Sequence, residues 1–453
     1  MSAEQNVVKE PSLFSITWPL FIEISLHMSL GILATLILSH YSDEAVAGLG
    51  VSNEILALFI LVFNVTAVGT TILVGQSIGA NRLDRARQLS RSSFGVNFWL
   101  GILVTALVFS SAPFLLQFYR LEGIIYDYAL VFLQITSLSL VLEALSLVLA
   151  SILRSYGYTK ETMVVTVMMN VISVSGNFIA ITGPFGLPVT GVPGVAWSIV
   201  IARLFAVIAL LILNYKILAL RFRLQNIIKI PKRDIHDVLS IGIPSGGEGL
   251  SYQVSQIVIT GFVSQLGAPH LSARVYIMNI SMVCYLFSSA IAQGNQLLVA
   301  RNIGSRHFDK ALQRTLRTLK LAMLVSFLVP LGIAFIGQPI LEIFTKDETI
   351  IAISLPVLWA IVFIEPGRAM NLVLMSSLKS AGDVRFPVVI GVICMWGIAV
   401  VFSYILGLKL GLGLLGVWIA QGIDEWVRGI FATQRWISQK WRKKYTDEQV
   451  LCS

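Results

Sequence analysis

The 453-residue chain is too apolar for a soluble protein, because charged residues make up 13% of it and hydrophobic residues 56%. In a soluble domain about a quarter of the residues are charged, and a charged fraction as low as that of this chain does not keep the surface solvated. The net charge of +9 could indicate nucleic acid, but the basic residues lie in connections between apolar runs. We therefore expect a membrane protein that binds no nucleic acid.

Apolar runs follow one another along the whole chain, and each is long enough to cross a bilayer as a helix, which takes about 20 residues. Six lie in the first half, at residues 13–38, 47–75, 92–117, 126–153, 161–185 and 194–215. Six lie in the second half, at residues 239–265, 272–299, 318–344, 351–378, 387–408 and 413–434. Long continuous runs do not resemble the short alternating strands of a membrane barrel, so we predict an all-α membrane protein with twelve transmembrane helices.

Basic residues gather in the connections that follow the even-numbered runs, whereas the odd-numbered connections are neutral or acidic, as at Asp43 and Asp347. The positive-inside rule makes the basic connections cytoplasmic. Both termini are then cytoplasmic, in a multi-pass protein. The N-terminus has no short apolar stretch with a cleavage site, so we expect no removable signal.

The two halves of the chain repeat each other at an offset of 225 residues. Because each half has an even number of runs, both insert in the same orientation, as two six-helix bundles related by a pseudo-two-fold axis along the membrane normal. Substrate is expected between such bundles. The matched positions include Pro19 and Pro244, Glu23 and Glu248, Asp84 and Asp309, and Arg154 and Lys379.

One long polar connection, residues 216–238, separates the halves. We divide the chain into an N-terminal lobe (1–220), a cytoplasmic linker (221–238), a C-terminal lobe (239–440) and a cytoplasmic tail (441–453), and expect a monomer. Pro19 and Pro244 lie in the first run of each half and are predicted to kink it.

The sequence gives no support to catalysis or to a bound metal. It contains no nucleophile–base arrangement and no phosphate-binding glycine loop, and Cys284, Cys394 and Cys452 have no metal-binding or disulfide spacing. We therefore expect no enzyme, no metal site and no cofactor.

Ionisable residues inside the runs are the candidates for function, because each is unfavourable in hydrocarbon without a partner or a wet cavity. Glu23 and Glu248 occupy equivalent positions, and Glu23 shares a helical face with His27 and Ala34. These carboxyls could couple transport to a proton or another cation. Alternatively, they are hydrogen-bonded groups near the cytoplasmic ends of their helices.

Glu143 and Arg368 also occupy equivalent positions in the repeat. They could pair across the midline or bind different groups of a substrate. Alternatively, Arg368 is neutralised by Glu365, one helical turn before it. Asp424 and Glu425 precede Arg428 by one turn, which favours a network within that helix. Three aromatic residues could form an organic-cation site or simply pack. They are Tyr252, Trp359 and Trp396.

Several motifs, in order and in duplicate, resemble the multidrug and toxic compound extrusion (MATE) family over nearly the whole chain. Residues 73–80 read Leu-Val-Gly-Gln-Ser-Ile-Gly-Ala, and 298–304 read Leu-Val-Ala-Arg-Asn-Ile-Gly. Residues 378–383 read Leu-Lys-Ser-Ala-Gly-Asp, and 186–194 have the pattern Gly-x-Pro-x-x-Gly-x-x-Gly. The segment 365–371 looks like a bacterial subgroup.

This resemblance implies a secondary antiporter of a bacterial plasma (inner) membrane. Such a protein exports organic, often cationic and amphipathic compounds by alternating access, driven by inward H+ or Na+. The nearest rival is a lipid or lipid-linked-sugar flippase of the same broad superfamily, which Arg368 leaves open. A membrane-embedded transferase is a rival of another class, but it needs polar catalytic clusters that the sequence lacks.

Four acidic residues that the resemblance leads us to expect are absent. Two of these positions are occupied by Ala34 and Tyr252. The other two fall near Asn177 and at or beside Arg368. Other carboxyls must then couple transport, or the coupling differs. The ion-coupling candidates are Glu23, Glu143, Glu248 and Glu365; the substrate-cavity candidates are His27, Ala34, Asn177, Tyr252, Arg368 and Asn371.

Overall fold

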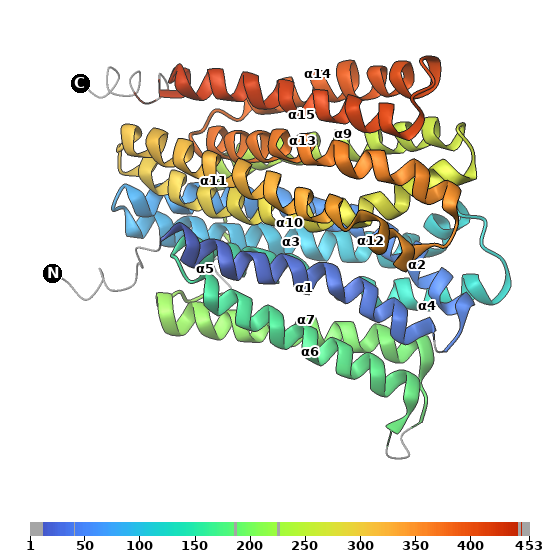
Figure 1. Cartoon of the computed structure of the whole chain (residues 1–453). Helices are drawn as coiled ribbons and strands as arrows, with labels where there is room; N and C mark the ends of the chain where they lie inside the picture. The colour runs from blue at the N-terminus through green and yellow to red at the C-terminus, as the bar shows by residue number, and fades with distance from the viewer. Residues whose placement is uncertain (1–11, 40, 185–187, 224–226, 443–444, 446–453) are drawn as a thin grey trace. The chain divides into compact units, whose positions relative to one another are not determined.

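The computed structural model describes residues 12–39, 41–184, 188–223, 227–442 and 445, which form helices joined by short connections (Figure 1). The chain divides into two compact units, Met1–Ile243 and Pro244–Ser453. Gly186 of the fourth motif and most of the predicted tail lie outside the described residues.

The helices α1 to α7 and the first turns of α9 make up most of the described part of the first unit. Helix α4 and helix α5 are bent by 46° and together replace the single run predicted at 126–153. Two apolar clusters fill the unit, one around Phe63 and Phe132 and one around Leu149 and Tyr156. The helices are α1 (Leu13–Ser39), α2 (Asp43–Gly79), α3 (Leu83–Gln117), α4 (Gly123–Ser137), α5 (Leu140–Ser155), α6 (Thr159–Thr182), α7 (Gly191–Leu218) and the first turns of α9 (Lys232–Ser264).

The second unit surrounds α13 (Glu348–Ser380), which lies against α10 (Ala268–Gly304), α11 (Phe308–Phe335) and α15 (Gly413–Ile437) (Figure 1). Its other elements are the remainder of α9, α12 (Gly337–Phe344), α14 (Arg385–Cys394), the π-helical segments Met395–Val400 and Ser403–Lys409, and the 3₁₀ turn Lys440–Arg442. In its most apolar window, 56% of α13 is buried, compared with 6% of α1. Polar side chains on α13 are therefore enclosed by protein.

The described helices account for the twelve predicted crossings. By length and composition, nine helices can cross a membrane, and the bent pair α4–α5 makes a tenth. Helices α9 and α15 have 33 and 25 residues, enough to cross, but they carry more polar side chains. The all-α fold with two six-helix bundles is thus confirmed.

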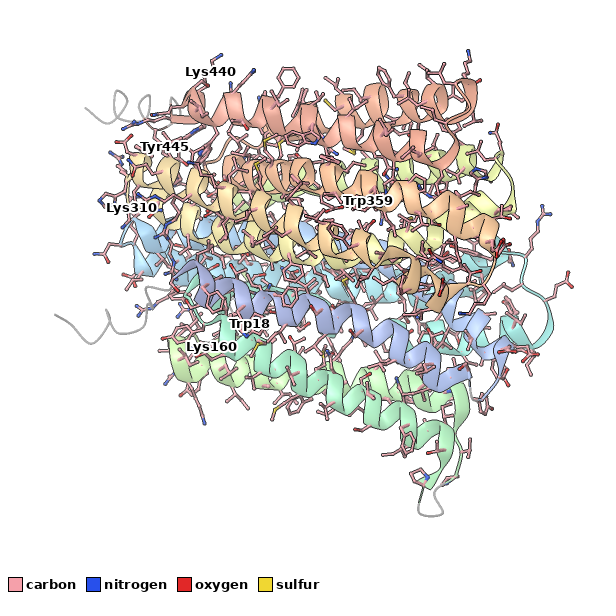
Figure 2. All side chains as sticks on the ribbon, in the orientation of Figure 1. Trp18, Lys160, Lys310, Trp359, Lys440 and Tyr445 are labelled. Atoms are coloured by element: carbon pink, nitrogen blue, oxygen red, sulfur yellow. The ribbon has the colours of Figure 1, made fainter. Side chains whose placement is uncertain are left out.

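Pro19 and Pro244 do not interrupt α1 and α9, which run through them as continuous helices. In the second unit, Lys310 and Lys440 lie at the same end of the helices (Figure 2). Close to them, Arg442 Nη1 lies 3.5 Å from Asp309 Oδ1. Two basic segments that the sequence assigns to one side of the membrane thus meet at one end of this unit.

The first three turns of α9 belong to the first unit, although most of them fall in the predicted linker. Asp234 has a fully buried side chain that accepts hydrogen bonds from Arg85 (2.5 Å), Gln88 (3.0 Å) and Ser92 (2.6 Å). A Cβ on Gly242 would lie 2.1 Å from the backbone oxygen of Val65. The boundary between the units therefore lies inside α9, at Pro244.

Candidate functional site

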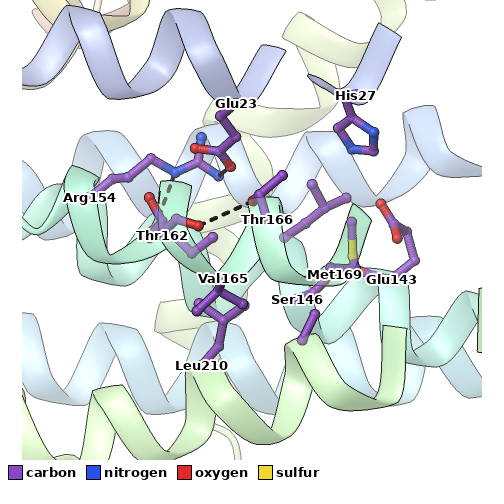
Figure 3. Close-up of a pocket in the computed structure, with 13 residues that line it drawn as sticks. Glu23, His27, Glu143, Ser146, Arg154, Thr162, Val165, Thr166, Met169 and Leu210 are labelled. Carbon is purple, nitrogen blue, oxygen red and sulfur yellow. Dashed lines mark hydrogen bonds and ion pairs between the residues drawn. The ribbon is translucent and has the colours of Figure 1, made fainter. Parts of the chain in front are cut away.

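A small cavity in the first unit is lined by α1, α5, α6 and α7 (Figure 3). Its volume is about 40 Å³, which has room for about three water molecules. A drug-sized compound needs several hundred Å³. The cavity therefore suits an ion or water rather than an organic substrate. Its polar lining residues are Glu23, His27, Glu143, Ser146, Arg154, Thr162 and Thr166.

Glu23, on α1, faces Arg154 at the end of α5. Glu23 Oε1 lies 3.6 Å from Arg154 Nη2, which is long for a direct ion pair. The other oxygen, Oε2, is buried without a hydrogen-bond partner. This carboxylate is thus only partly neutralised, beside a space that can hold water.

The equivalent residue of the second unit, Glu248 on α9, has a stronger partner. Lys379 Nζ donates to Glu248 Oε2 at 2.6 Å, and the two side chains are 16% and 15% exposed. Gly391 of α14 lies against the same carboxylate, since a Cβ there would be 3.1 Å from Oε1. Both members of the symmetric pair are therefore held by a basic residue of their own unit.

Glu143, on α5, is paired within the first unit by Arg203 of α7. Glu143 Oε2 lies 3.0 Å from Arg203 Nε, and Arg203 Nη1 donates to Ser139 Oγ at 2.6 Å. Helix packing alone brings these residues together, because 60 positions separate them in the sequence. The structure thus supplies a partner that sequence spacing could not indicate.

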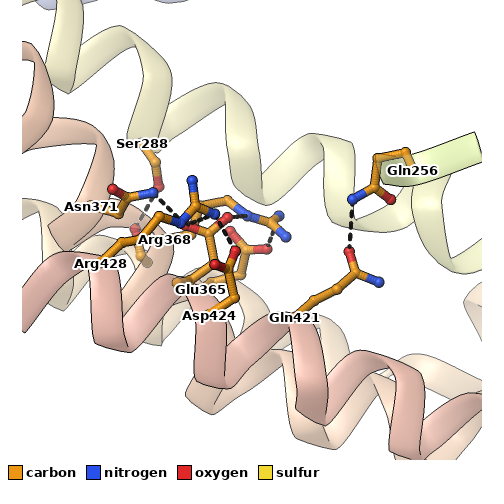
Figure 4. A network of polar contacts seen from close by, with 10 residues as sticks. Gln256, Ser288, Glu365, Arg368, Asn371, Gln421, Asp424 and Arg428 are labelled. Atoms are coloured by element: carbon orange, nitrogen blue, oxygen red, sulfur yellow. Dashed lines mark hydrogen bonds and ion pairs between the residues drawn. The ribbon is translucent and has the colours of Figure 1, made fainter. Parts of the chain in front are cut away.

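In the second unit, Arg368 pairs with Glu365 of the same helix, which is the local alternative considered from the sequence. Arg368 Nη1 lies 2.5 Å from Glu365 Oε1, and Arg368 Nε lies 3.4 Å from Glu425 Oε1 on α15. Asn371 Nδ2 donates to Glu425 Oε2 at 2.7 Å. Arg368 and Asn371 of α13 therefore both contact the Glu425 carboxylate of α15, and Glu365 is linked to it through Arg368. Figure 4 shows the three residues of α13 close together.

The contacts continue along α15. Arg428 Nη2 lies 3.4 Å from Glu425 Oε2 and also contacts Asp424 Oδ2. The predicted network within this helix is present, and its link to α13 through Arg368 was not predicted. Glu425 is the residue that connects the two helices.

A group of amides and one further guanidinium borders this network. Gln256 Nε2 of α9 lies 3.4 Å from Gln421 Oε1 of α15, and Arg274 Nη2 of α10 donates to Gln256 Oε1 at 3.0 Å. The Arg274 guanidinium also lies 5.4 Å from the ring centroid of Trp418. Nothing in the sequence analysis singled out these residues.

The remaining candidates are dispersed. His27 lines the cavity with a largely exposed side chain, and Tyr252 is 40% exposed. Ala34 is half-buried, and Asn177 is buried with an unpartnered Oδ1. Trp359 packs edge-on against Phe335, and Trp396 donates to Ser251. These contacts agree with the packing alternative for the two tryptophans.

Comparisons with known proteins agree with this architecture. The family model MatE matches residues 19–179 and 244–405, one segment in each unit. The chain is 41% identical over 433 residues to the "Uncharacterized transporter YisQ" of Bacillus subtilis (strain 168), covering 96% of this chain and 95% of that protein. It is 26% identical to the "Probable multidrug resistance protein NorM" of Thermotoga maritima, covering 95% and 93%.

Solved structures share the fold at low sequence identity. A structure described as "Outward-facing conformation of a multidrug resistance MATE family transporter of the MOP superfamily" has a TM-score of 0.86 at 18% identity, covering 97% of this chain and 98% of that chain. Another, described as "Reverse polarity of binding pocket suggests different function of a MOP superfamily transporter from Pyrococcus furiosus Vc1", has a TM-score of 0.87 at 18% identity, covering 98% and 99%.

Proposed function

This chain belongs to the MatE family of membrane transporters, and on that premise we propose that it exports organic, amphipathic or cationic compounds by cation-coupled antiport. Inward movement of H+ or Na+ drives alternating access of a substrate site. The protein is a transporter and not an enzyme, in keeping with the family. The relatives named as multidrug resistance proteins support the choice of substrate class.

One observation carries this proposal: both units bury carboxylates within membrane-length helical segments, the bent pair α4–α5 in the first unit and α13 in the second. Glu143 is 4% exposed and Glu365 is 1% exposed. Ionisable residues at such depth are unfavourable unless they are paired, and in membrane proteins they mark ion and proton pathways. A coupled transporter needs groups of this kind, whereas an inert scaffold of helices does not.

The flippase alternative draws no support from Arg368. Its guanidinium contacts Glu365 and Glu425, both carboxylates of the same unit. A lipid phosphate would have to displace these partners. We therefore retain the exporter as the proposed function.

We also propose that both termini lie in the cytoplasm of a bacterial plasma membrane. Cysteines introduced at Lys310 and Lys346 test this orientation, because Lys310 lies in the first turn of α11 and Lys346 follows the end of α12. Lys346→Cys should react with an impermeant thiol reagent in intact cells, and Lys310→Cys should react only after permeabilisation. The reverse pattern would contradict the orientation.

Efflux from proteoliposomes tests the transport function. Purified protein is reconstituted with ethidium as a fluorescent organic cation, and a pH gradient or a sodium gradient is imposed separately. We expect either the pH gradient or the sodium gradient to drive ethidium against the concentration gradient of ethidium. Movement under neither gradient would reject the proposal, provided that the protein still binds ethidium.

Glutamine variants of the four candidate carboxyls then locate the coupling group. Glu23→Gln, Glu143→Gln, Glu248→Gln and Glu365→Gln each remove a titratable charge while keeping a similar shape. The matched control is Glu342→Gln, since Glu342 is a half-buried acid of α12, outside the candidate sites, hydrogen-bonded by Gln338. Loss of gradient-driven efflux with retained ethidium binding identifies a coupling residue.

A further inference from the structure

The buried charges of α13 and α15 form one chain in which the sign of the charge alternates. Glu365 contacts Arg368, Arg368 contacts Glu425, Glu425 contacts Arg428, and Arg428 contacts Asp424. Both ends of the chain are acidic. It therefore holds three carboxylates and two guanidiniums, and one negative charge is in excess when all five groups are ionised.

An excess charge at this depth is unfavourable. The end residues Glu365 and Asp424 are 1% and 3% exposed. An uncompensated ion in a low-dielectric interior is destabilising by several kcal/mol, which a bound proton removes. The chain thus requires a counter-charge, and a proton is the smallest that fits.

Each end of the chain has one oxygen that can accept this proton. Glu365 Oε2 and Asp424 Oδ1 are both buried without a hydrogen-bond partner. The opposite oxygens, Oε1 and Oδ2, are those that contact the guanidiniums. Protonation at either end therefore breaks no hydrogen bond of the chain.

Side chains on the neighbouring helices do not supply the missing positive charge. Cys284 of α10 interacts electrostatically with Glu365, and Cys394 of α14 with Asp424. Tyr252 of α9 interacts in the same way with Arg368 and Glu425. All three are neutral at ordinary pH.

Two further charged residues lie on the neighbouring helices. Glu248 of α9 acts on Arg428 but is itself paired by Lys379. Arg274 of α10 keeps its positive charge, since its partners Gln256 and Trp418 are neutral, but no described carboxylate is within ion-pair distance of it. The excess negative charge of the chain is thus without a direct partner among the residues that the structure describes.

We propose that this chain of five residues is a proton site that holds one proton, shared between its two ends. The proposal rests on the proposed function and names the proton as the coupling ion. It assigns the task to Glu365 together with Asp424, two carboxyls on different helices.

The two positions of the proton have different consequences for the contact between α13 and α15. With the proton on Glu365, Arg368 loses its local anion and can bind Glu425 more closely, which tightens the link between the helices. With the proton on Asp424, Arg428 draws Glu425 into α15 and weakens that link. Because Glu425 is shared by both arginines, the chain has two arrangements that a proton selects.

Thermal unfolding of the detergent-solubilised protein tests the charge count. Glu365→Gln and Asp424→Asn each leave two carboxylates and two guanidiniums, whereas the double variant leaves an excess positive charge. We expect each single variant to unfold no earlier than wild type above about pH 8. The double variant should unfold at a clearly lower temperature than either single variant. Its loss of stability should exceed the sum of the changes in the two single variants.

The pH dependence gives a second readout. A proton that only the folded protein binds stabilises it, and this contribution is lost as the pH rises and the proton dissociates. Wild type and the Glu342→Gln control should therefore lose stability as the pH rises to about 9, while both single variants should lose less. Additive losses in the double variant, or an unchanged pH dependence in the single variants, would overturn the proton site.

Ethidium transport separates this inference from the proposed function. If wild type moves ethidium under a pH gradient and both single variants bind it but lose gradient-driven movement, both proposals are supported. If the single variants transport as wild type does, the proton site is rejected and the exporter stands. If wild type moves no dye under either gradient while the unfolding results are as expected, the exporter is rejected and the proton site stands.

Discussion

The two units use the same positions of their repeat in different ways. Glu23 and Arg154 in the first unit correspond to Glu248 and Lys379 in the second. The Glu23 and Glu248 side chains are almost equally exposed, at 13% and 15%, yet their distances to the base are 3.6 Å and 2.6 Å. Exposure therefore does not explain the difference.

The surroundings explain it better. A cavity lies beside Glu23, and Thr166 lines it; the residue 225 positions later is Gly391, which packs directly on Glu248. Water in the cavity can solvate the first pair, while the second is closed by protein. We infer that the ion pair Glu248–Lys379 is structural. The ion pair Glu23–Arg154 can separate with a small loss of free energy.

The units differ also in charge balance. In the first unit Glu143 has Arg203 as a single partner. In the second, three carboxylates share two guanidiniums, with Glu365 at one end. Removal of one carboxyl should therefore unbalance the charges in the first unit and balance them in the second.

The largest expected effect comes from this contrast. Glu143→Gln leaves Arg203, whose side chain is 15% exposed, as an uncompensated cation, so it should lower the free energy of unfolding by about 3 kcal/mol. Glu365→Gln leaves two carboxylates and two guanidiniums in the row of buried charges, so it should change the free energy of unfolding by less than about 1 kcal/mol. Thermal unfolding at about pH 7 measures both. Equal losses in the two variants would contradict the difference in charge balance.

The second prediction compares the two symmetric ion pairs. Lys379→Met should destabilise by about 3 kcal/mol, because the enclosed Glu248 carboxylate loses its short contact with the ammonium group. Arg154→Met should cost about 1 kcal/mol, since water can replace the guanidinium beside Glu23.

Thermal unfolding of the two variants and of Lys379→Met/Glu248→Gln checks this comparison. The double variant should recover most of the loss, because the uncompensated charge is gone. If Arg154→Met is as damaging as Lys379→Met, the first pair is as firmly held as the second and our reading of the cavity is wrong.

These contrasts show what the sequence could and could not predict. Apolar runs of membrane length identified the helices, and a one-turn spacing indicated that Glu365 pairs with Arg368. Helical periodicity carries that information. The bend of 46° between α4 and α5 was not predicted, because an apolar run has the same composition whether it is straight or bent.

Contacts between helices were the part that remained hidden. The repeat identified Glu248 and Lys379 as counterparts of Glu23 and Arg154, but equivalence does not show which residues touch. The Glu143–Arg203 pair and the link from Arg368 to Glu425 depend on how α5 packs on α7 and how α13 packs on α15. The spacing of residues in the sequence does not predict either of these helix contacts.

The smallest predicted effect concerns Gly391, the residue that closes the second pair. In Gly391→Ala the added Cβ would lie 3.1 Å from Glu248 Oε1, so the flexible carboxylate must move by a few tenths of an ångström. Alanine in a helix is more stable than glycine by about 0.5 to 1 kcal/mol, which offsets the crowding. The net change should therefore be below about 1 kcal/mol.

The matched control for this variant is Gly332→Ala in α11, where nothing lies within 4 Å of the added Cβ. It should gain the helical contribution alone, so Gly391→Ala should unfold slightly earlier than Gly332→Ala. When Glu248→Gln is added to both, the gap between them should narrow, because an uncharged amide holds Lys379 less tightly and can move aside. A gap that is unchanged by Glu248→Gln would show that Gly391 acts through helix packing and not by closing the ion pair.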